Sequence, residues 1–182
     1  MNKKLIILAL FSSFYLYSAD SANKTELNCS ENGYVKVYDS CKNKFIEIRP
    51  ISLRSLSECK LCSTALSADG RFVALSCSNQ AIEIWDIQSK KVLKALCGHI
   101  GIIKAMAWSN NGKYLAIGSS SKGIIQIWDV QTKKLIKQFN PTNNAEDAIL
   151  SINWNKKQTK IYVSFASGQR KKIGDLFESI ND

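Results

Sequence analysis

Histidine is almost absent from this sequence, whose one histidine is His99. Acid–base catalysis and zinc binding in proteins usually need histidines, or cysteines grouped at metal-ligand spacing. Cys59 and Cys62 form the only Cys-x-x-Cys pair. No paired carboxylates recur at matching positions of the chain. These absences argue against a catalytic site, a metal site and a bound cofactor.

Arginine is also scarce, because most of the 25 basic residues are lysines. The net charge of +10 would suit an anionic partner such as nucleic acid, an acidic polymer or a membrane surface. However, phosphates and base edges are usually held by the rigid fork of a guanidinium group. Binding of nucleic acid or another polyanion is therefore a secondary hypothesis.

No apolar run is long enough for a typical membrane-spanning helix. The run from Leu5 to Tyr17 follows Lys3 and Lys4 and is followed by small and polar residues. This order is typical of a secretory signal peptide. We predict a signal peptide at residues 1–21, a linker at 22–26 and export to the periplasm or the extracellular space, without membrane contact after cleavage. A membrane anchor formed by an uncleaved N-terminal segment is the alternative.

Export would make disulfides possible, but the sequence does not reveal which cysteines pair. Cys29 and Cys77 occupy matching places before an aromatic residue, which favours small buried strand residues. The six cysteines are Cys29, Cys41, Cys59, Cys62, Cys77 and Cys97.

The same pattern occurs twice between residues 66 and 129. A glycine turn at Gly70, and again at Gly112, is followed by alternating apolar segments and then by a Trp-Asp pair, at 85–86 and at 128–129. The two Trp-Asp pairs lie 43 residues apart. A period of about 40–45 residues with turn, strand and Trp-Asp in step indicates a repeat architecture of propeller blades.

Weaker copies flank these two repeats. Tyr38-Asp39 occupies the place of an earlier Trp-Asp pair, and Gly174-Asp175 that of a later one. Short segments with period-2 alternation between turn signals predict an all-β fold. We predict a partial propeller over residues 27–182, with about three and a half to four blades, each a four-stranded antiparallel sheet. The expected strands are 27–30, 34–39, 45–48, 61–66, 71–76, 81–85, 92–96, 102–108, 114–119, 124–128, 135–139, 149–155, 160–165 and 170–173.

The Trp-Asp residues have structural roles in this scheme. A buried indole N–H needs an acceptor, and serines eight to ten residues before Trp85 and Trp128 are candidates. Asp86 and Asp129 begin the turn after the third strand of each repeat. There each carboxylate is expected to accept hydrogen bonds from the backbone N–H groups that follow.

These motifs resemble the WD-repeat (WD40-type) β-propellers over roughly residues 27 to 175. The resemblance implies that Gly98-His99 opens a blade and that His99 is a structural histidine. It also implies that Ser119 or Ser120 is the hydroxyl of a hydrogen-bonded set with Trp128. The family has aspartate at the turn position of this set, whereas the three copies in this chain have Asn32, Asn79 and Lys122 there. No blade therefore has the complete set.

Lysines recur at the turn into the fourth strand of each repeat, which would be the outermost strand of its blade. Lysine on an exposed edge discourages pairing with another chain. A basic rim that binds an anionic partner is the competing interpretation. In the two clear repeats these residues are Lys90, Lys91, Lys94, Lys133, Lys134 and Lys137.

The resemblance and the scarcity of catalytic groups favour a non-catalytic protein-interaction module, a scaffold or adaptor whose partner the sequence does not identify. The predicted interaction face is the rim around Lys60, Asn79, Lys104 and Lys122. Alternatives are a polyanion-binding protein, a propeller enzyme, and a truncated or decayed WD-repeat fragment. Because a short arc of blades leaves apolar end faces uncovered, a homodimer or association with another propeller is also expected as an option.

Overall fold

The computed structural model describes residues 27–29, 35–39, 44–48, 61–77, 82–98, 101–119, 123–142 and 147–174. In these ranges the regular secondary structure consists of β-strands, which form four antiparallel sheets. The first sheet contains β1 (Leu27–Cys29), β2 (Val35–Asp39) and β3 (Lys44–Ile48). The second contains β4 (Leu61–Leu66), β5 (Phe72–Cys77), β6 (Ile82–Asp86) and β7 (Lys91–Leu96). The third contains β8 (Ile103–Trp108), β9 (Tyr114–Ser119), β10 (Ile125–Asp129) and β11 (Lys134–Phe139), and the fourth β12 (Ile149–Trp154), β13 (Ile161–Phe165) and β14 (Arg170–Ile173).

The all-β prediction is confirmed, and each predicted strand end lies within one residue of an observed one. Strand order within each sheet follows the chain, so β7 and β11 are the outermost strands of their sheets. The predicted placement of the lysines is confirmed as well, because Lys91 begins β7 and Lys134 begins β11. Lys90 and Lys133 precede these strands with φ of 56° and 59°, in the turns that lead into them.

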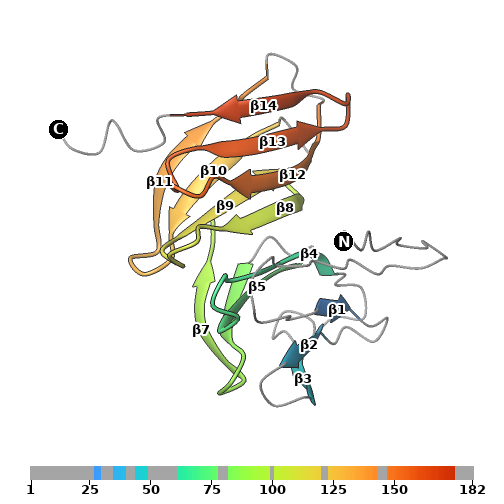
Figure 1. Ribbon diagram of the computed structural model, residues 1–182, viewed down its shortest axis with the longest axis vertical. Helices are drawn as coiled ribbons and strands as arrows, with labels where there is room; N and C mark the ends of the chain where they lie inside the picture. Colours follow the sequence, from blue (N-terminus) through green and yellow to red (C-terminus); the bar gives the residue numbers. More distant parts are fainter. Residues whose placement is uncertain are drawn as a thin grey trace, which may run out of the picture.

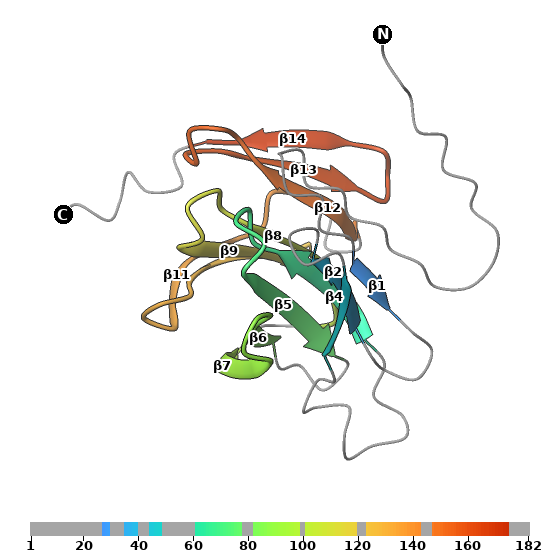
Figure 2. The ribbon, with the colours of Figure 1, turned by 60° about the horizontal axis from the view of Figure 1, so that its bottom comes forward.

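The four sheets follow one another in chain order along an arc, from the first sheet (blue) to the fourth (red) in Figure 1. The strands β4, β8 and β12, each the first of its sheet, lie next to one another. Figure 2 shows β4 and β8 side by side from a second direction. The sheets thus fan out from these inner strands as successive blades, and the described residues form a partial propeller.

Apolar side chains fill each space between successive sheets. The strands β6 and β10 are buried at every position because a sheet lies on both of their faces. Full burial of one large aliphatic side chain stabilises the fold by roughly 1.5–3 kcal/mol. Sheet-to-sheet contact is therefore the main source of stability, and none of the inner sheets buries its apolar surface alone.

Glycine turns join the first two strands of the second and third sheets. Gly70 and Gly112 have φ of 69° and 68°, a backbone conformation that favours glycine. The hydroxyls of Ser67 and Ser109 accept hydrogen bonds from the backbone N–H groups of Phe72, at 2.8 Å, and Tyr114, at 2.9 Å. These turns set the register of β4 with β5 and of β8 with β9.

Among the described residues there is no helix with the length and apolar character needed to cross a bilayer.

Candidate protein-interaction groove

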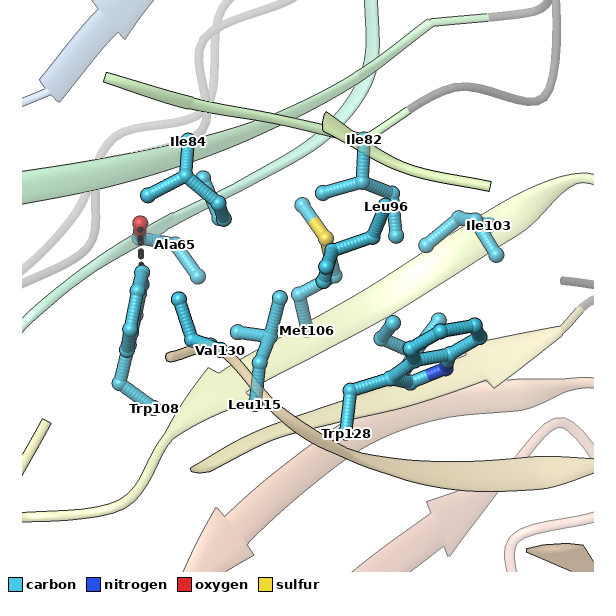
Figure 3. Packing of buried hydrophobic residues seen from close by; sticks show 12 residues of the cluster. Ala65, Ile82, Ile84, Leu96, Ile103, Met106, Trp108, Leu115, Trp128 and Val130 are labelled. Carbon is cyan, nitrogen blue, oxygen red and sulfur yellow. Dashed lines mark hydrogen bonds between the residues drawn. The ribbon is translucent and has the colours of Figure 1, made fainter. Parts of the chain in front are cut away.

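Trp108, at the end of β8, connects the third sheet to the second. Its indole N–H donates to the backbone carbonyl of Ala65 on β4 at 3.0 Å, as Figure 3 shows. The ring also stacks on Phe72 of β5, with 6.4 Å between centroids and 29° between planes. One side chain thus fixes how far the two sheets stand apart at this rim.

Trp154 repeats this arrangement between the fourth sheet and the third. Its indole N–H donates to the carbonyl of Ala107 at 2.9 Å, and its ring lies 6.5 Å from that of Tyr114. Sequence reasoning missed both connections. The signal that points to them is the recurrence of tryptophan at the ends of two strands that match each other, at 108 and 154.

A groove opens beside Trp108 between the second and third sheets, with a volume of about 470 Å³. Its floor is apolar, because Ile84 and Val130 are buried beneath it and Phe72 and Trp108 form one wall. Leu93 lies on the rim with 47% of its surface exposed. We call this feature the inter-sheet groove and define it by its lining residues Phe72, Ile84, Leu93, Lys94, Trp108, Asn111, Gly112, Lys113, Val130 and Gln131.

Two lysines make the rim of the inter-sheet groove basic. The ammonium of Lys94 donates to the carbonyl of Gln131 at 2.6 Å, across the gap between the sheets. The ammonium of Lys113 lies 5.0 Å from the centre of the Tyr114 ring and 4.0 Å from a carboxylate oxygen of Asp129. No aspartate or glutamate is among the residues that line the groove. An apolar group with negatively charged neighbours fits this combination of floor and rim.

Asp86 and Asp129 hold the turns that follow β6 and β10, as predicted, and the second of these turns contains the lining residue Gln131. Asp86 accepts from the backbone N–H of Ser89, and Asp129 from that of Thr132, each at 2.8 Å. Asp86 also pairs with the guanidinium of Arg71 at 3.2 Å. The Ser89 hydrogen bond is the main cause that lowers the pKa of Asp86. Burial by itself would raise the pKa of Asp129, but the hydrogen bonds from Thr132 and the charge of Lys113 outweigh it and lower that pKa.

The prediction that serines accept from the indoles of Trp85 and Trp128 is wrong. Trp85 donates to a carboxylate oxygen of Glu83 at 2.8 Å, and Trp128 to the side-chain oxygen of Gln126 at 3.3 Å. Side chains two residues apart on a strand share a face, so each acceptor lies beside its ring. The hydroxyl of Ser76, one of the candidate serines, is buried without a hydrogen-bond partner among the described atoms.

Most residues of the predicted interaction face lie outside the described residues, namely Lys60, Asn79 and Lys122. His99 and Ser120 of the expected hydrogen-bonded set lie outside them as well. Lys104 is exposed on β8. Ser119 is buried at the end of β9, where its backbone N–H donates to the carbonyl of Ile124 at 3.0 Å. That face and the complete set stay predictions.

In the ranges that the structure describes, no three or more His, Cys, Asp or Glu side chains are placed to hold a metal ion. Cys97 follows β7 as an exposed free thiol. The side chains of Cys29 and Cys77, at the ends of β1 and β5, lie outside the description.

Comparison with known families supports what the geometry indicates. Residues 96–157 match the family described as the anaphase-promoting complex subunit 4 WD40 domain. These residues are similar to a WD40 domain. Two similar curated proteins are Protein FIZZY-RELATED 1 of Arabidopsis thaliana and the B-type cell cycle switch protein ccs52A of Medicago truncatula. Each is 26% identical over 116 residues, which cover 64% of this chain and 23% of the relative.

The matched region therefore spans about a quarter of the length of these relatives. WD40-repeat domains typically bind protein partners and are generally non-catalytic. The inter-sheet groove lies between the second and third sheets, of which the third falls wholly within the matched residues.

Proposed function

We propose that this WD40-repeat chain is a non-catalytic protein-interaction module, a scaffold or adaptor, and that the inter-sheet groove is a recognition site. The observation that carries the proposal is the groove itself. It has a volume of about 470 Å³, lies at a junction between two sheets, and combines an apolar floor with a basic rim. Exposed apolar surface of this kind, bordered by polar groups, is typical of protein-interaction sites.

The partner we propose is an extended peptide segment with one apolar anchor between acidic residues. The anchor would contact Phe72, which is partly buried, and the nearly buried Trp108 and Val130. The acidic flanks would lie near Lys94, whose ammonium donates to a backbone carbonyl, and near Lys113, which already lies 4.0 Å from Asp129. The buried anchor would supply most of the affinity, and the charges would mainly select among partners.

A peptide-display selection tests this proposal. The full chain is used as bait, and the Leu93→Asp variant is used for counter-selection, because Leu93 is exposed and its replacement should leave the fold intact. We expect enriched peptides that combine an aromatic or aliphatic residue with Asp or Glu and that lose at least about tenfold in affinity for Leu93→Asp, a difference of roughly 1.4 kcal/mol.

The matched control is Leu135→Asp, which changes an exposed leucine on β11 that does not line the groove. Lys94→Glu should weaken the same peptides, and Lys134→Glu, at the exposed start of β11, should not. Peptides that bind both Leu93→Asp and Leu135→Asp as tightly as the unaltered chain would refute the groove as the site. A selection without any enriched sequence would refute the module itself.

The lysines on the outermost strands support a second candidate function, polyanion binding. Lys90, Lys91 and Lys94 on one sheet and Lys133, Lys134 and Lys137 on the next form a repeated basic edge. Binding of heparin or single-stranded DNA should then fall steeply between low and moderate salt. Affinity that does not change with salt would eliminate this candidate.

Export is a further part of the proposal, supported by the order of residues 1–21. N-terminal sequencing of the protein purified from its source is expected to begin near residue 22, and a chain that begins at Met1 or Asn2 would contradict signal-peptide cleavage. The face predicted around Lys104 is also proposed as a second contact surface. Lys104→Glu, on the exposed side of β8, tests that surface separately from the groove.

A further inference from the structure

The outer face of the fourth sheet differs in chemistry from the corresponding face of the third sheet. On the third sheet this face packs against the fourth, and its residues are buried and small or aliphatic. They are Ala105, Ala107, Ala116, Gly118, Ile125 and Ile127.

The strand registers identify the equivalent residues of the fourth sheet. Ala107 pairs with Ala116 in the third sheet as Asn153 pairs with Tyr162 in the fourth. Gly118 pairs with Ile125 as Ser164 pairs with Arg170. By the same registers Ser151 replaces Ala105 and Lys172 replaces Ile127. All six equivalent positions are polar, charged or tyrosine, although the neighbouring Leu150 of β12 is apolar and 58% exposed. The opposite face keeps the apolar residues Ile152, Ile161, Val163 and Phe165.

Steric room changes together with polarity. Gly118 has no space for a side chain, because a Cβ there would lie 2.7 Å from the Cγ2 of Ile149 on the next sheet. The small residues of the third sheet thus allow the fourth to approach closely. At the position of Ala116 the fourth sheet has Tyr162, which is 47% exposed. A blade packed there at the same distance would overlap the tyrosine ring.

Charge makes such packing still less favourable. Arg170 and Lys172 are exposed on this face, where they line a shallow hollow of about 520 Å³ together with Ser151, Asn153 and Tyr162. An apolar neighbour would remove two cations from water without offering a partner charge. Terminal units of repeat proteins typically carry such a polar outer face.

We propose that this surface, which we call the end face, is the hydrated end of the blade stack. Neither a further WD40-type blade nor a second copy of this chain packs on it in the way that the fourth sheet packs on the third. Two copies therefore do not complete a ring by placing the first sheet of one against the fourth sheet of the other.

Labelling of Tyr162 in the full chain tests the proposal directly. Nitration or iodination, read by peptide mass spectrometry, should modify Tyr162 several times faster than Tyr114, which lies half-buried in the contact between the third and fourth sheets. The rate at Tyr162 should not change with protein concentration. A protected Tyr162, or one that becomes protected as concentration rises, would overturn the proposal.

A second experiment restores the interior chemistry. The variant Asn153→Ala, Tyr162→Ala, Arg170→Ile, Lys172→Ile gives four of the six end-face positions the residues of the third sheet, and we expect it to self-associate in sedimentation experiments. Lys156→Ala with Lys157→Ala removes the same charge from an exposed turn and should leave the mass unchanged. If the fourfold variant sediments like this control, its polar side chains are not what keeps the face uncovered, and the proposal fails. Neither experiment involves the inter-sheet groove. If the end-face proposal fails, the proposed function is therefore unaffected and is still decided by the peptide-display selection.

Discussion

The junction between the second and third sheets is open at its rim, whereas the junction between the third and fourth is tightly closed. In the closed junction, Asn110 donates to the carbonyl of Lys156 at 3.5 Å, and the backbone N–H of Asn111 donates to the side chain of Gln158 at 3.3 Å, so the two turns meet. In the open junction, Lys94 reaches Gln131 instead, and the inter-sheet groove lies beside that contact.

The same repeat scaffold underlies both junctions, since each has an indole bonded to a carbonyl of the preceding sheet. The difference lies in the turn residues. Asp69 accepts from the hydroxyl of Ser67 and the N–H of Arg71, and Asn111 accepts in the same way from Ser109 and Lys113. In addition, the side chain of Asn110 and the backbone N–H of Asn111 donate to the fourth sheet. Local bonding is therefore common to both turns, and the additional bonds across the junction are what close it.

The largest expected effect concerns the two indoles. Trp108→Ala should lower the free energy of unfolding by about 3–5 kcal/mol, because it removes a nearly buried ring and its hydrogen bond. Trp154→Ala should cost less, since Trp154 is only partly buried. Urea denaturation followed by circular dichroism measures both. An equal or larger loss for Trp154→Ala would show that the closed junction, rather than the open one, depends more on its tryptophan.

Gly118→Ala should disrupt the closed junction specifically. The new methyl group would meet Ile149 at 2.7 Å, and overpacking of this kind typically costs about 1–3 kcal/mol. Gly174→Ala is the control, because its nearest new contact is Lys160 Cε at 3.5 Å. Thermal unfolding of the two variants should differ clearly, and equal melting temperatures would mean that the sheets separate easily at Gly118.

Acid should weaken the Asp86 turn and the Asp129 turn, one on each of the two sheets that form the open junction. Their pKa values are lowered in the folded protein. Each carboxylate therefore stabilises the fold fully above its unfolded pKa, near 3.9, and this stabilisation is lost as pH falls through the lower folded pKa.

Asp86→Asn should therefore cost roughly 1–2 kcal/mol at pH 7 and flatten the loss of stability below about pH 4. Asp129→Asn should cost less, because Lys113 lies farther from its carboxylate than Arg71 does from Asp86. Urea titrations at a series of pH values measure both effects. An unchanged acid limb in Asp86→Asn would contradict the assignment.

Ser76→Ala should have the smallest effect and the opposite sign. Ser76 occupies the position of Gly118 in the second sheet, and its buried hydroxyl has no partner among the described atoms. Removing it should raise the free energy of unfolding by up to about 1 kcal/mol, because an unsatisfied buried hydroxyl is unfavourable. Chemical denaturation is precise enough to detect such a gain. A loss of stability would indicate that the hydroxyl binds a group of the chain or a water molecule.

Strand positions were predictable because alternation with period 2 and glycine turns are local signals, as the agreement at β4, β9 and β14 shows. The turn roles of Asp86 and Asp129 were predictable for the same reason, since their partners lie three residues away. The indole partners were not. Serines at the expected spacing are present, but Glu83 and Gln126 lie on the same strand and the same face as the rings and take the hydrogen bonds.

Sequence by itself determined that the chain forms short strands in repeated units, because each unit carries its own alternation, turns and Trp-Asp pair within about 40 residues. Only the tertiary structure decided which junction opens as a groove and which side chains share the outer face of the fourth sheet. Those outcomes depend on side chains that belong to different blades and on the space left between packed sheets. No pattern within one repeat records that space.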